Sequence, residues 1–285
     1  MTKLAIMSDL HIDLNHFGFF EKQTLKQVLR NQNVSHLHLA GDISNHFYTD
    51  SLPFIQELQK ECQVTYNLGN HDMLDLQEKE IQDLDFHLHS IGKKQLLAFH
   101  GWYDYSFSNQ NKSDISKLKQ TFWFDRRLKR QKNDLQTTEN SLTRLDKTLT
   151  SLDSNHLIVA MHFVPHYNFI MTHERFKPFN AFLGSQKFHE LFKKHKVKDV
   201  VFGHAHRSYG TTIIDGISYH SRPLGYLREW NLTIDFVSQN PQYNPSKSWN
   251  LSKRYNAVKD LSVYQNYKKQ NLAKEFYHAM TLFDL

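Results

Sequence analysis

Five short apolar runs, each followed within three residues by aspartate, asparagine or histidine, constrain the fold of this 285-residue chain most strongly. The runs occupy residues 4–7, 37–40, 64–67, 157–160 and 200–202. Because they are continuous and not alternating, they are typical of strands that are covered on both faces. Segments with helical spacing separate the first three runs. The pattern therefore predicts an α/β fold with crossover connections and a largely parallel sheet.

The polar residues that follow these runs are expected to meet, because ligands bind beyond the carboxyl ends of strands in such sheets. They are Asp9, His11, Asp42, Asn70, His71, His162, His204 and His206. Carboxylate, imidazole and amide oxygen are the ligands that Mn²⁺, Fe²⁺ and Zn²⁺ accept. This set is too large for one tetrahedral ion and suits two ions that share a carboxylate.

Glycine placement supports the same interpretation. Three of the ten glycines directly precede a candidate ligand, namely Gly41, Gly69 and Gly203. A glycine at that point lets the chain turn sharply off a strand and lets the backbone approach a bound ligand.

In chain order, these motifs resemble those of the calcineurin-like metallophosphoesterases. The matching residues are Asp9-Leu10-His11, Gly41-Asp42, Gly69-Asn70-His71-Asp72, His162 and Gly203-His204-Ala205-His206. The motifs are short, and they are spread from residue 9 to residue 206. The resemblance implies a four-layer αββα sandwich of two mixed β-sheets, here with a helical insertion.

The resemblance also implies a role for each matching residue. One metal ion would be held by Asp9, His11 and His206, and the other by Asn70, His162 and His204. Asp42 would bridge both ions, and His71 would act as the general acid beside the leaving group. A hydroxide bridging the two ions would attack phosphorus in line. The metals are expected to be two ions of manganese, iron or zinc. Asp72 is expected to orient the His71 ring or a ligand imidazole.

The substrate contacts are less clearly marked. After Gly41-Asp42 the chain continues with Ile43-Ser44-Asn45-His46, where the protein-phosphatase branch has an Asp-Arg pair, which argues against a phosphoprotein substrate. Candidate substrate contacts are Asn70, His46, His166, Arg222 and Tyr103. A surface position is an equal alternative for His166, which follows a proline.

The organisation along the chain predicts a phosphoesterase domain over residues 1–238 and a helical extension over residues 239–285 that packs on it. Within the domain, residues 102–152 form a helical and basic insertion, and residues 113–152 are expected to be helix. Leucines recur there every seven residues, at Leu128, Leu135, Leu142 and Leu149. This stripe either packs on the body of the protein, closes a helical hairpin, or forms a dimer seam.

Composition excludes several classes of protein. Cys62 is the single cysteine, so neither an internal disulfide nor a multi-thiolate zinc site is expected. No apolar run approaches the roughly 20 residues of a membrane span, and the N-terminus is not typical of a signal peptide. The chain is therefore expected in the cytoplasm, as a monomer or homodimer. Its net charge of +6 is a mild bias toward anionic partners.

The sequence thus predicts a metal-dependent phosphoric ester hydrolase that acts on a small phosphate monoester or diester, nucleotides included. One alternative is a non-catalytic scaffold that keeps the fold, against which the presence of His71 argues. Another is a nuclease that uses the basic insertion to bind nucleic acid. Because the net charge is modest, the nuclease is the lowest-ranked of these functions.

Overall fold

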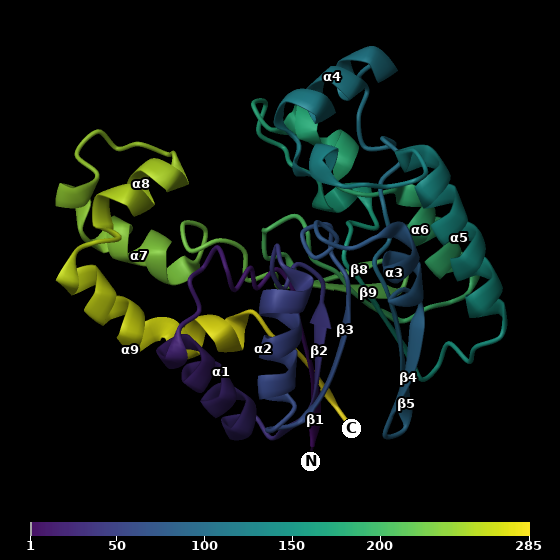
Figure 1. Ribbon diagram of the computed structural model, residues 1–285, viewed down its shortest axis with the longest axis horizontal. Helices are drawn as coiled ribbons and strands as arrows, with labels where there is room; N and C mark the ends of the chain where they lie inside the picture. The colour runs from purple at the N-terminus through teal and green to yellow at the C-terminus, as the bar shows by residue number, and fades with distance from the viewer. Residues whose placement is uncertain (1) are drawn as a thin grey trace.

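The apolar runs form strands of two stacked β-sheets in the computed structural model, which describes residues 2–285 and leaves out Met1 (Figure 1). One sheet has the strand order β10-β1-β2-β3, from β10 (Thr281–Asp284), β1 (Lys3–Met7), β2 (Val34–Ala40) and β3 (Gln63–Asn67). The parallel strands are β1, β2 and β3, whereas β10 runs antiparallel to β1. This sheet is therefore mixed.

The second sheet has the order β4-β5-β6-β7-β9-β8. Its strands are β4 (His87–Ile91), β5 (Lys94–Phe99), β6 (Leu157–Met161), β7 (Asp199–Val201), β8 (Gly210–Ile214) and β9 (Ile217–Ser221). The hairpin partners β4 and β8 are antiparallel, and the four strands between them are parallel. Asp215-Gly216 forms the turn of the predicted β8–β9 hairpin, with Gly216 at φ 79°.

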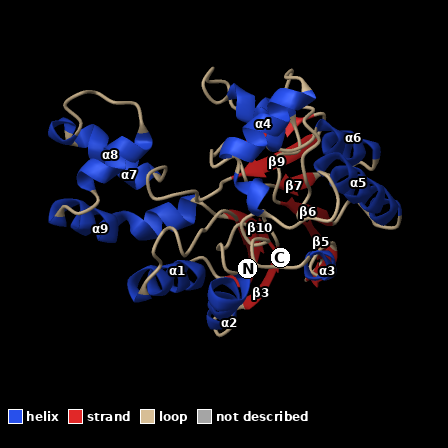
Figure 2. Ribbon diagram, turned by 45° about the horizontal axis from the view of Figure 1, so that its top comes forward, coloured by secondary structure: helices blue, strands red, loops and turns tan. Residues whose placement is uncertain are grey.

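Alternate side chains of each strand point to opposite faces, which produces the layers (Figure 2). Leu4 and Ile6 of β1 pack between the two sheets, whereas Ala5 and Met7 pack under helices. Helices α1 (Phe19–Asn31) and α2 (Leu52–Leu58) cover the outer face of the four-stranded sheet. Helices α5 (Asp134–Thr150) and α6 (Gln186–Lys194) cover the outer face of the six-stranded sheet. The predicted four-layer αββα sandwich is confirmed.

The insertion is not the continuous helix that was predicted for residues 113–152. Helix α4 (Lys112–Phe122) ends at Trp123, and a 3₁₀ turn η2 (Phe124–Arg127) precedes α5. Asn133 restarts the helix, because its side chain accepts a hydrogen bond from the Gln136 N–H at 2.9 Å. The crowded positive charges between the two helices also disfavour helix there.

The leucine stripe packs on the body of the protein from its midpoint onward. Leu142, Leu145 and Leu149 are buried in the core beneath the six-stranded sheet, whereas Leu135 is 39% exposed. A stripe that is already covered by its own chain leaves little apolar surface for a dimer seam, so this geometry favours the intramolecular alternative.

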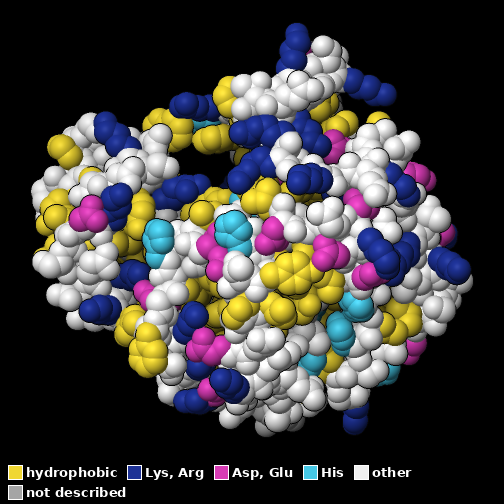
Figure 3. Space-filling view, viewed as in Figure 1, with side chains coloured by type: hydrophobic (Ala, Val, Ile, Leu, Met, Phe, Trp, Pro, Cys, Tyr) yellow, Lys and Arg dark blue, Asp and Glu magenta, His cyan; other side chains and the backbone are white. Residues whose placement is uncertain are grey.

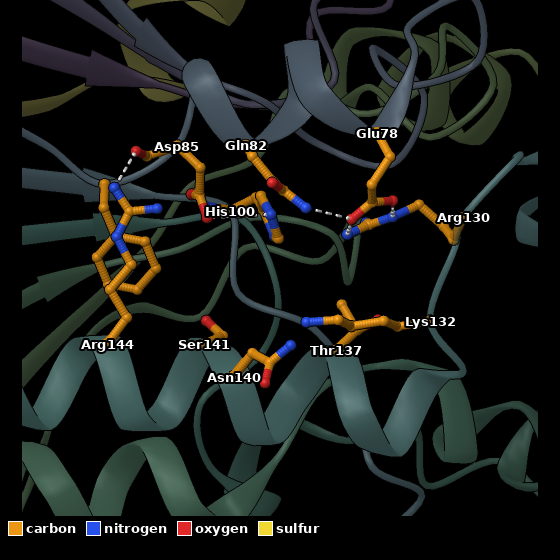
Figure 4. Close-up of a pocket in the computed structure, with 11 residues that line it drawn as sticks. Glu78, Gln82, Asp85, His100, Arg130, Lys132, Thr137, Asn140, Ser141 and Arg144 are labelled. Carbon is orange, nitrogen blue, oxygen red and sulfur yellow. Dashed lines mark hydrogen bonds and ion pairs between the residues drawn. The ribbon is translucent and has the colours of Figure 1, made fainter.

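An ion pair and a hydrogen bond also hold the insertion against the body (Figure 4). Arg130 Nε lies 2.7 Å from Glu78 Oε2 at the start of helix α3 (Glu78–Asp83), and Arg144 donates to the Asp85 carbonyl at 3.0 Å. These residues line a cavity of about 260 Å³ that contains none of the candidate ligands. The cavity therefore lies between the insertion and the rest of the molecule.

The C-terminal segment joins the four-stranded sheet. Helices α7 (Asn231–Gln239), α8 (Leu251–Val258) and α9 (Ser262–His278) form one end of the molecule in Figure 1, and α9 packs on α1. The extension was expected to be helical throughout, but it ends in β10, which brings the two termini together. Among residues 2–285, no helix has the length and apolar character that crossing a membrane requires.

Candidate metal centre

The polar residues after β1, β2, β3, β6 and β7 meet where the carboxyl ends of the two sheets lie side by side. Two groups of carboxylates and imidazoles there have ligand atoms within 4.8 Å of one another. The first group is Asp9, His11, Asp42 and His206, and the second is Asp42, His162 and His204. Asp42 belongs to both groups, as a bridging ligand must.

In the first group, two imidazole nitrogens and two carboxylates lie close together. Nε2 of His11 lies 3.0 Å from Nε2 of His206 and 3.7 Å from Oδ2 of Asp42. Nε2 of His206 also lies 3.3 Å from Oδ1 of Asp9. Two imidazole nitrogens that face each other between two carboxylates are arranged as ligands of a shared cation.

The second group repeats this arrangement on the other side of Asp42. Nε2 of His162 lies 3.3 Å from Oδ2 of Asp42 and 3.3 Å from Nδ1 of His204. The amide oxygen of Asn70 lies 3.3 Å from the same His162 nitrogen. Asn70 therefore adds a neutral oxygen ligand to this group.

Three of the imidazoles are held from behind by an oxygen. The outer nitrogen of His162 lies 3.1 Å from the Ala40 carbonyl, and that of His204 lies 3.1 Å from the Phe182 carbonyl. Nδ1 of His206 lies 2.9 Å from Oε2 of Glu229. An acceptor on the outer nitrogen places the proton there and leaves the inner nitrogen as a metal ligand.

Nearby carboxylates favour the charged form of two histidines in the cluster. Burial opposes charge on His162 and His206, but the carboxylates of Asp42 and Glu229 raise the pKa of these rings to about 9 and about 10. Burial lowers the pKa of His204 to about 3. Cations would replace the two protons, because they satisfy the same carboxylates.

Backbone strain gathers at the same place. Five of the candidate ligands have a positive φ, which is uncommon outside glycine: Asp9, His11, Asp42, His204 and His206. Two neighbouring glycines leave no room for a side chain, because a Cβ at Gly69 would collide with Asp42 and one at Gly203 would collide with Asp9. Strain of this kind persists where the surrounding structure demands it, typically at functional sites.

The donor set fits two divalent cations. It offers buried carboxylates, an amide oxygen and imidazole nitrogens that face inward. Burial of so many polar groups in one cluster is costly unless something satisfies them. Nitrogen and oxygen ligands suit manganese, iron and zinc alike.

His71 lies beside this cluster, with its ring 4.7 Å from that of His11. Nδ1 of His71 lies 2.8 Å from the amide oxygen of Asn45, and the Asn45 amide nitrogen donates to Asp13 at 2.7 Å. Asp13 therefore turns the amide oxygen toward the ring, which places a proton on Nδ1 and leaves Nε2 for other partners.

Asp72 does not hydrogen-bond to an imidazole ring in the described part of the chain, although the sequence predicted that it would orient one. Its carboxylate contacts no imidazole among residues 2–285. It accepts hydrogen bonds from the backbone N–H groups of Asp42, Ile43, Ser44 and Gly69, at 2.7 to 3.1 Å. Burial and the Asp42 carboxylate raise the pKa of Asp72 to about 7, and these N–H groups oppose the rise. Asp72 shapes the two loops that carry Asp42 and Asn70, and Asn45 orients His71 in its place.

The insertion reaches directly into the cluster. The Asn70 amide nitrogen donates to Oδ1 of Asp125 in η2 at 2.8 Å, so the amide oxygen faces His162. Phe124 of the same turn stacks on His71 with ring centroids 3.8 Å apart. Sequence reasoning missed both residues, because nothing in the pattern of the insertion indicates which side chains face the body.

The cluster forms the floor of a cavity of about 360 Å³, which we call the aromatic cavity. Asp42, Asn70, His71, His204 and His206 reach its surface. Its walls carry Phe122, Trp123 and Phe124 from the insertion, together with Phe176 and Phe179 from residues 165–184. A substrate thus reaches the candidate ligands along an apolar wall.

The other candidate substrate contacts lie outside this cavity. His46 is exposed and its ring makes no hydrogen bond within residues 2–285, whereas its neighbour Asn45 is buried beside His71. His166 is buried against His189 and Tyr219, and burial lowers its pKa to about 4. Tyr103 is fully buried and stacks on Trp102, and Arg222 lines no cavity at the cluster. The structure brings Asn70 alone of these five to the cluster.

Comparisons with known proteins agree with this geometry. The family model described as calcineurin-like phosphoesterase matches residues 2–208. A search of curated protein sequences finds no match. Among solved structures, a phosphopantetheinyl hydrolase from Mycobacterium tuberculosis is similar, with a TM-score of 0.64 and 18% identity over 80% of this chain and 91% of that one. A purple acid phosphatase from yellow lupin seeds has a TM-score of 0.42 and 14% identity, over 75% of this chain and 39% of that chain. At 18% identity, the similarity to the hydrolase structure shows the fold alone.

Proposed function

The chain belongs to the calcineurin-like phosphoesterase family, and from this premise we propose that it hydrolyses a small phosphate monoester or diester. The observation that carries the proposal is the pair of ligand groups that share Asp42, with His71 beside them. When two cations are bound, they supply charge for the phosphoryl oxygens and a water that ionises near neutral pH.

The chain itself supplies the remaining parts of the reaction. Asp9, His11 and His206 would hold one ion, Asn70, His162 and His204 the other, and Asp42 both. An anionic substrate close to the His71 ring favours its charged form, which carries a proton on Nε2 as well as on Nδ1. The Nε2 proton can then pass to the leaving oxygen, while Asn45 holds Nδ1.

The walls of the aromatic cavity support the proposed chemistry by limiting water. Trp123 and Phe124 stand over the cluster, and a drier site strengthens the interaction between phosphate and bound cations. The insertion therefore contributes to the site as well as to its access.

A substrate panel tests this proposal. Phosphomonoesters, phosphodiesters, nucleoside pyrophosphates and a phosphopantetheinyl diester would be assayed with added Mn²⁺, the last because one similar structure is a phosphopantetheinyl hydrolase. We expect turnover of at least one class and its loss in His71→Ala. Stoichiometric metal without turnover of any member would instead support the non-catalytic scaffold.

Nucleic acid binding, the metals, the cellular location and the oligomeric state stay predictions. Nucleic acid as a substrate remains the lower-ranked alternative, and its affinity would have to fall steeply with salt. The identity of the metals, a cytoplasmic setting and the choice between monomer and homodimer are testable by metal analysis, cell fractionation and light scattering.

A further inference from the structure

A second cavity opens on the other side of the His71–Phe124 stack. It has a volume of about 420 Å³, and its lining includes His71, Phe124, Asn45, Tyr226, Arg127 and Arg228. We call it the arginine cavity. Lys and Arg side chains gather around the hollow between the α8 end and the α4 end of the molecule in Figure 3. His71, Phe124 and Tyr226 line both cavities, so the two meet at the candidate general acid.

Both arginines lie over aromatic rings that touch site histidines. The Arg127 guanidinium lies 4.9 Å from the centroid of Phe124, and the Phe124 ring stacks on His71 with centroids 3.8 Å apart. The Arg228 guanidinium lies 4.1 Å from the centroid of Tyr226, which stacks on His11 at 4.6 Å. In each case a single aromatic ring thus contacts both a guanidinium and a histidine of the candidate site.

Within the described residues, the two arginine side chains together form a single ion pair. Arg127 is exposed, and its side chain makes no hydrogen bond or ion pair within residues 2–285. Arg228 lies 3.4 Å from Glu229, whose carboxylate is already held by His206 at 2.9 Å. The described lining of the arginine cavity contains no aspartate or glutamate. Arg127 has no carboxylate partner, and Arg228 shares Glu229 with His206, so the two guanidinium groups together favour an anion, and their planar fork matches phosphate.

The remaining basic residues of the insertion do not extend this site. Arg130 is paired with Glu78, and Lys119 with Asp134. Neither Lys129 nor Arg126 lines the cavity. The positive charge is therefore local, on the scale of one phosphate group, and does not form the extended stripe that a polynucleotide would need.

We propose that the arginine cavity binds a second phosphate group, carried by the leaving group of the substrate. The proposal rests on the proposed function and narrows it: the preferred substrate is a phosphodiester with an apolar or planar group on one side and a second phosphate on the other. His71 and its partner Asn45 both line the arginine cavity, and a general acid must stand on the leaving-group side. In the reaction, the bond from phosphorus to the leaving oxygen breaks, a bond to the water oxygen forms, and the leaving oxygen takes up a proton.

The test uses ligands that cannot be hydrolysed. Propylphosphonate and alkane bisphosphonates with linkers of about three to six methylene groups would be titrated calorimetrically into the Mn²⁺-loaded protein. We expect a bisphosphonate of one linker length to bind about tenfold more tightly than the monophosphonate, since one charge-assisted contact is sufficient for that difference.

Variants assign the preference to the arginine cavity. The double variant Arg127→Ala/Arg228→Ala is expected to lose the preference, and each single variant to lose part of it. Lys129→Ala removes a nearby exposed charge that lines neither cavity, and this control is expected to keep the preference. If the double variant misfolds, the single variants decide the question.

The outcomes separate this inference from the proposed function. Equal binding of monophosphonate and bisphosphonate at every linker length, or a preference that survives in the arginine variants, overturns the inference. Hydrolysis of bis(4-nitrophenyl) phosphate, measured in parallel, reports on the proposed function by itself. Hydrolysis without a bisphosphonate preference would reject the second phosphate site and leave the phosphoesterase proposal standing.

Discussion

His162, His204 and His206 each turn one ring nitrogen toward the cluster because an oxygen atom holds the other nitrogen. The inner nitrogens therefore point inward before any cation arrives. At the scale of single residues, the site is a set of ligands that are oriented by partners distant in the sequence, such as Glu229 behind His206.

Metal binding is predicted to release protons. The pKa values of His162 and His206, about 9 and about 10, mean that both rings are charged at pH 7 in the metal-free protein. A cation must displace these protons, so apparent affinity for Mn²⁺ rises with pH up to these values. Calorimetry in buffers of different ionisation enthalpy measures the release, which we expect to approach two protons at pH 7. An affinity that is independent of pH between about 6 and 9 would contradict the assignment of these ligands.

Asn45 is predicted to act as a positioning residue for His71. Asn45→Ala removes the acceptor of Nδ1, so the ring loses its orientation and donates its proton less effectively. We expect kcat for esters with poor, alkyl leaving groups to fall about 100-fold, the lower part of the range for general acid catalysis. Esters of 4-nitrophenol, which leave without protonation, are expected to lose much less.

The comparison of leaving groups is the decisive readout for Asn45. A structural defect would lower both activities equally, and that outcome would remove Asn45 from the catalytic arrangement. Thr49→Ala, an exposed change four residues away, serves as a control and is expected to preserve both rates.

At the scale of elements, the turn η2 joins the insertion to the metal centre. Asp125 is buried and accepts hydrogen bonds from Asn70 and Trp123, both at 2.8 Å. Asp125→Ala frees the Asn70 amide to rotate. We expect the ion on the side of His162 and His204 to bind about 10- to 100-fold more weakly, as for other partners of metal ligands. Competition with a coloured chelator would measure the loss, and Lys117→Ala on the exposed face of α4 is the matched control. Retention of both ions with unchanged affinity would show that the insertion does not orient Asn70.

The joint between the insertion and the body is predicted to depend on Glu78. Its side chain and that of Arg130 are only 5% and 11% exposed. Glu78→Gln leaves the guanidinium without its charge partner, so we expect the free energy of unfolding to fall by about 1–3 kcal/mol at pH 7. Urea unfolding followed by circular dichroism measures this change.

The pH dependence of the same pair has a definite sign. Burial opposes charge on Glu78, but Arg130 outweighs it and holds the pKa of Glu78 below its usual value. The pair therefore stabilises the fold above the usual pKa of glutamate, about 4.3, and its contribution is lost as the pH falls. The difference between the wild-type chain and Glu78→Gln should shrink below about pH 4. A difference that persists in acid would assign the effect to packing.

The sequence predicted strands better than it predicted the insertion. The central strands are continuous apolar runs, a pattern that burial on both faces imposes. Within residues 113–152 no glycine or proline interrupts the helical pattern, so the break at Trp123 could not be foreseen. At that break Trp123 stacks on Phe182 and Asp125 accepts a hydrogen bond from Asn70, both of them contacts with residues distant in the sequence.

At the scale of the whole molecule, two sheets are needed because each ligand group combines residues that follow strands of both sheets. Asp9, His11, Asp42 and Asn70 follow strands of the four-stranded sheet, whereas His162, His204 and His206 follow strands of the six-stranded one. A stack of two sheets places both sets of strand ends at one edge. The C-terminal strand β10 pairs with β1, so the last residues support the sheet that carries half of the site.

The ligands were predictable from the sequence, whereas the substrate contacts were not. A ligand follows directly from the end of a strand, where chain direction and sheet order place it. A residue that lines a cavity at this edge depends on which loop folds over it, as the loops with Phe124, Arg127 and Arg228 do here from elements distant in the sequence. His46 and Asn45 show the limit most clearly, since neighbouring residues differ in burial and only the second reaches His71.

The central claim is that Asp42 joins two cations in one site. Metal analysis of the purified protein after incubation with Mn²⁺, compared with Asp42→Asn, tests it most directly. We predict about two ions per chain in the wild type, fewer than one in the variant, and loss of phosphoesterase turnover with the metal. A wild-type chain without stoichiometric metal, or an Asp42→Asn chain with unchanged metal content and turnover, would contradict the account.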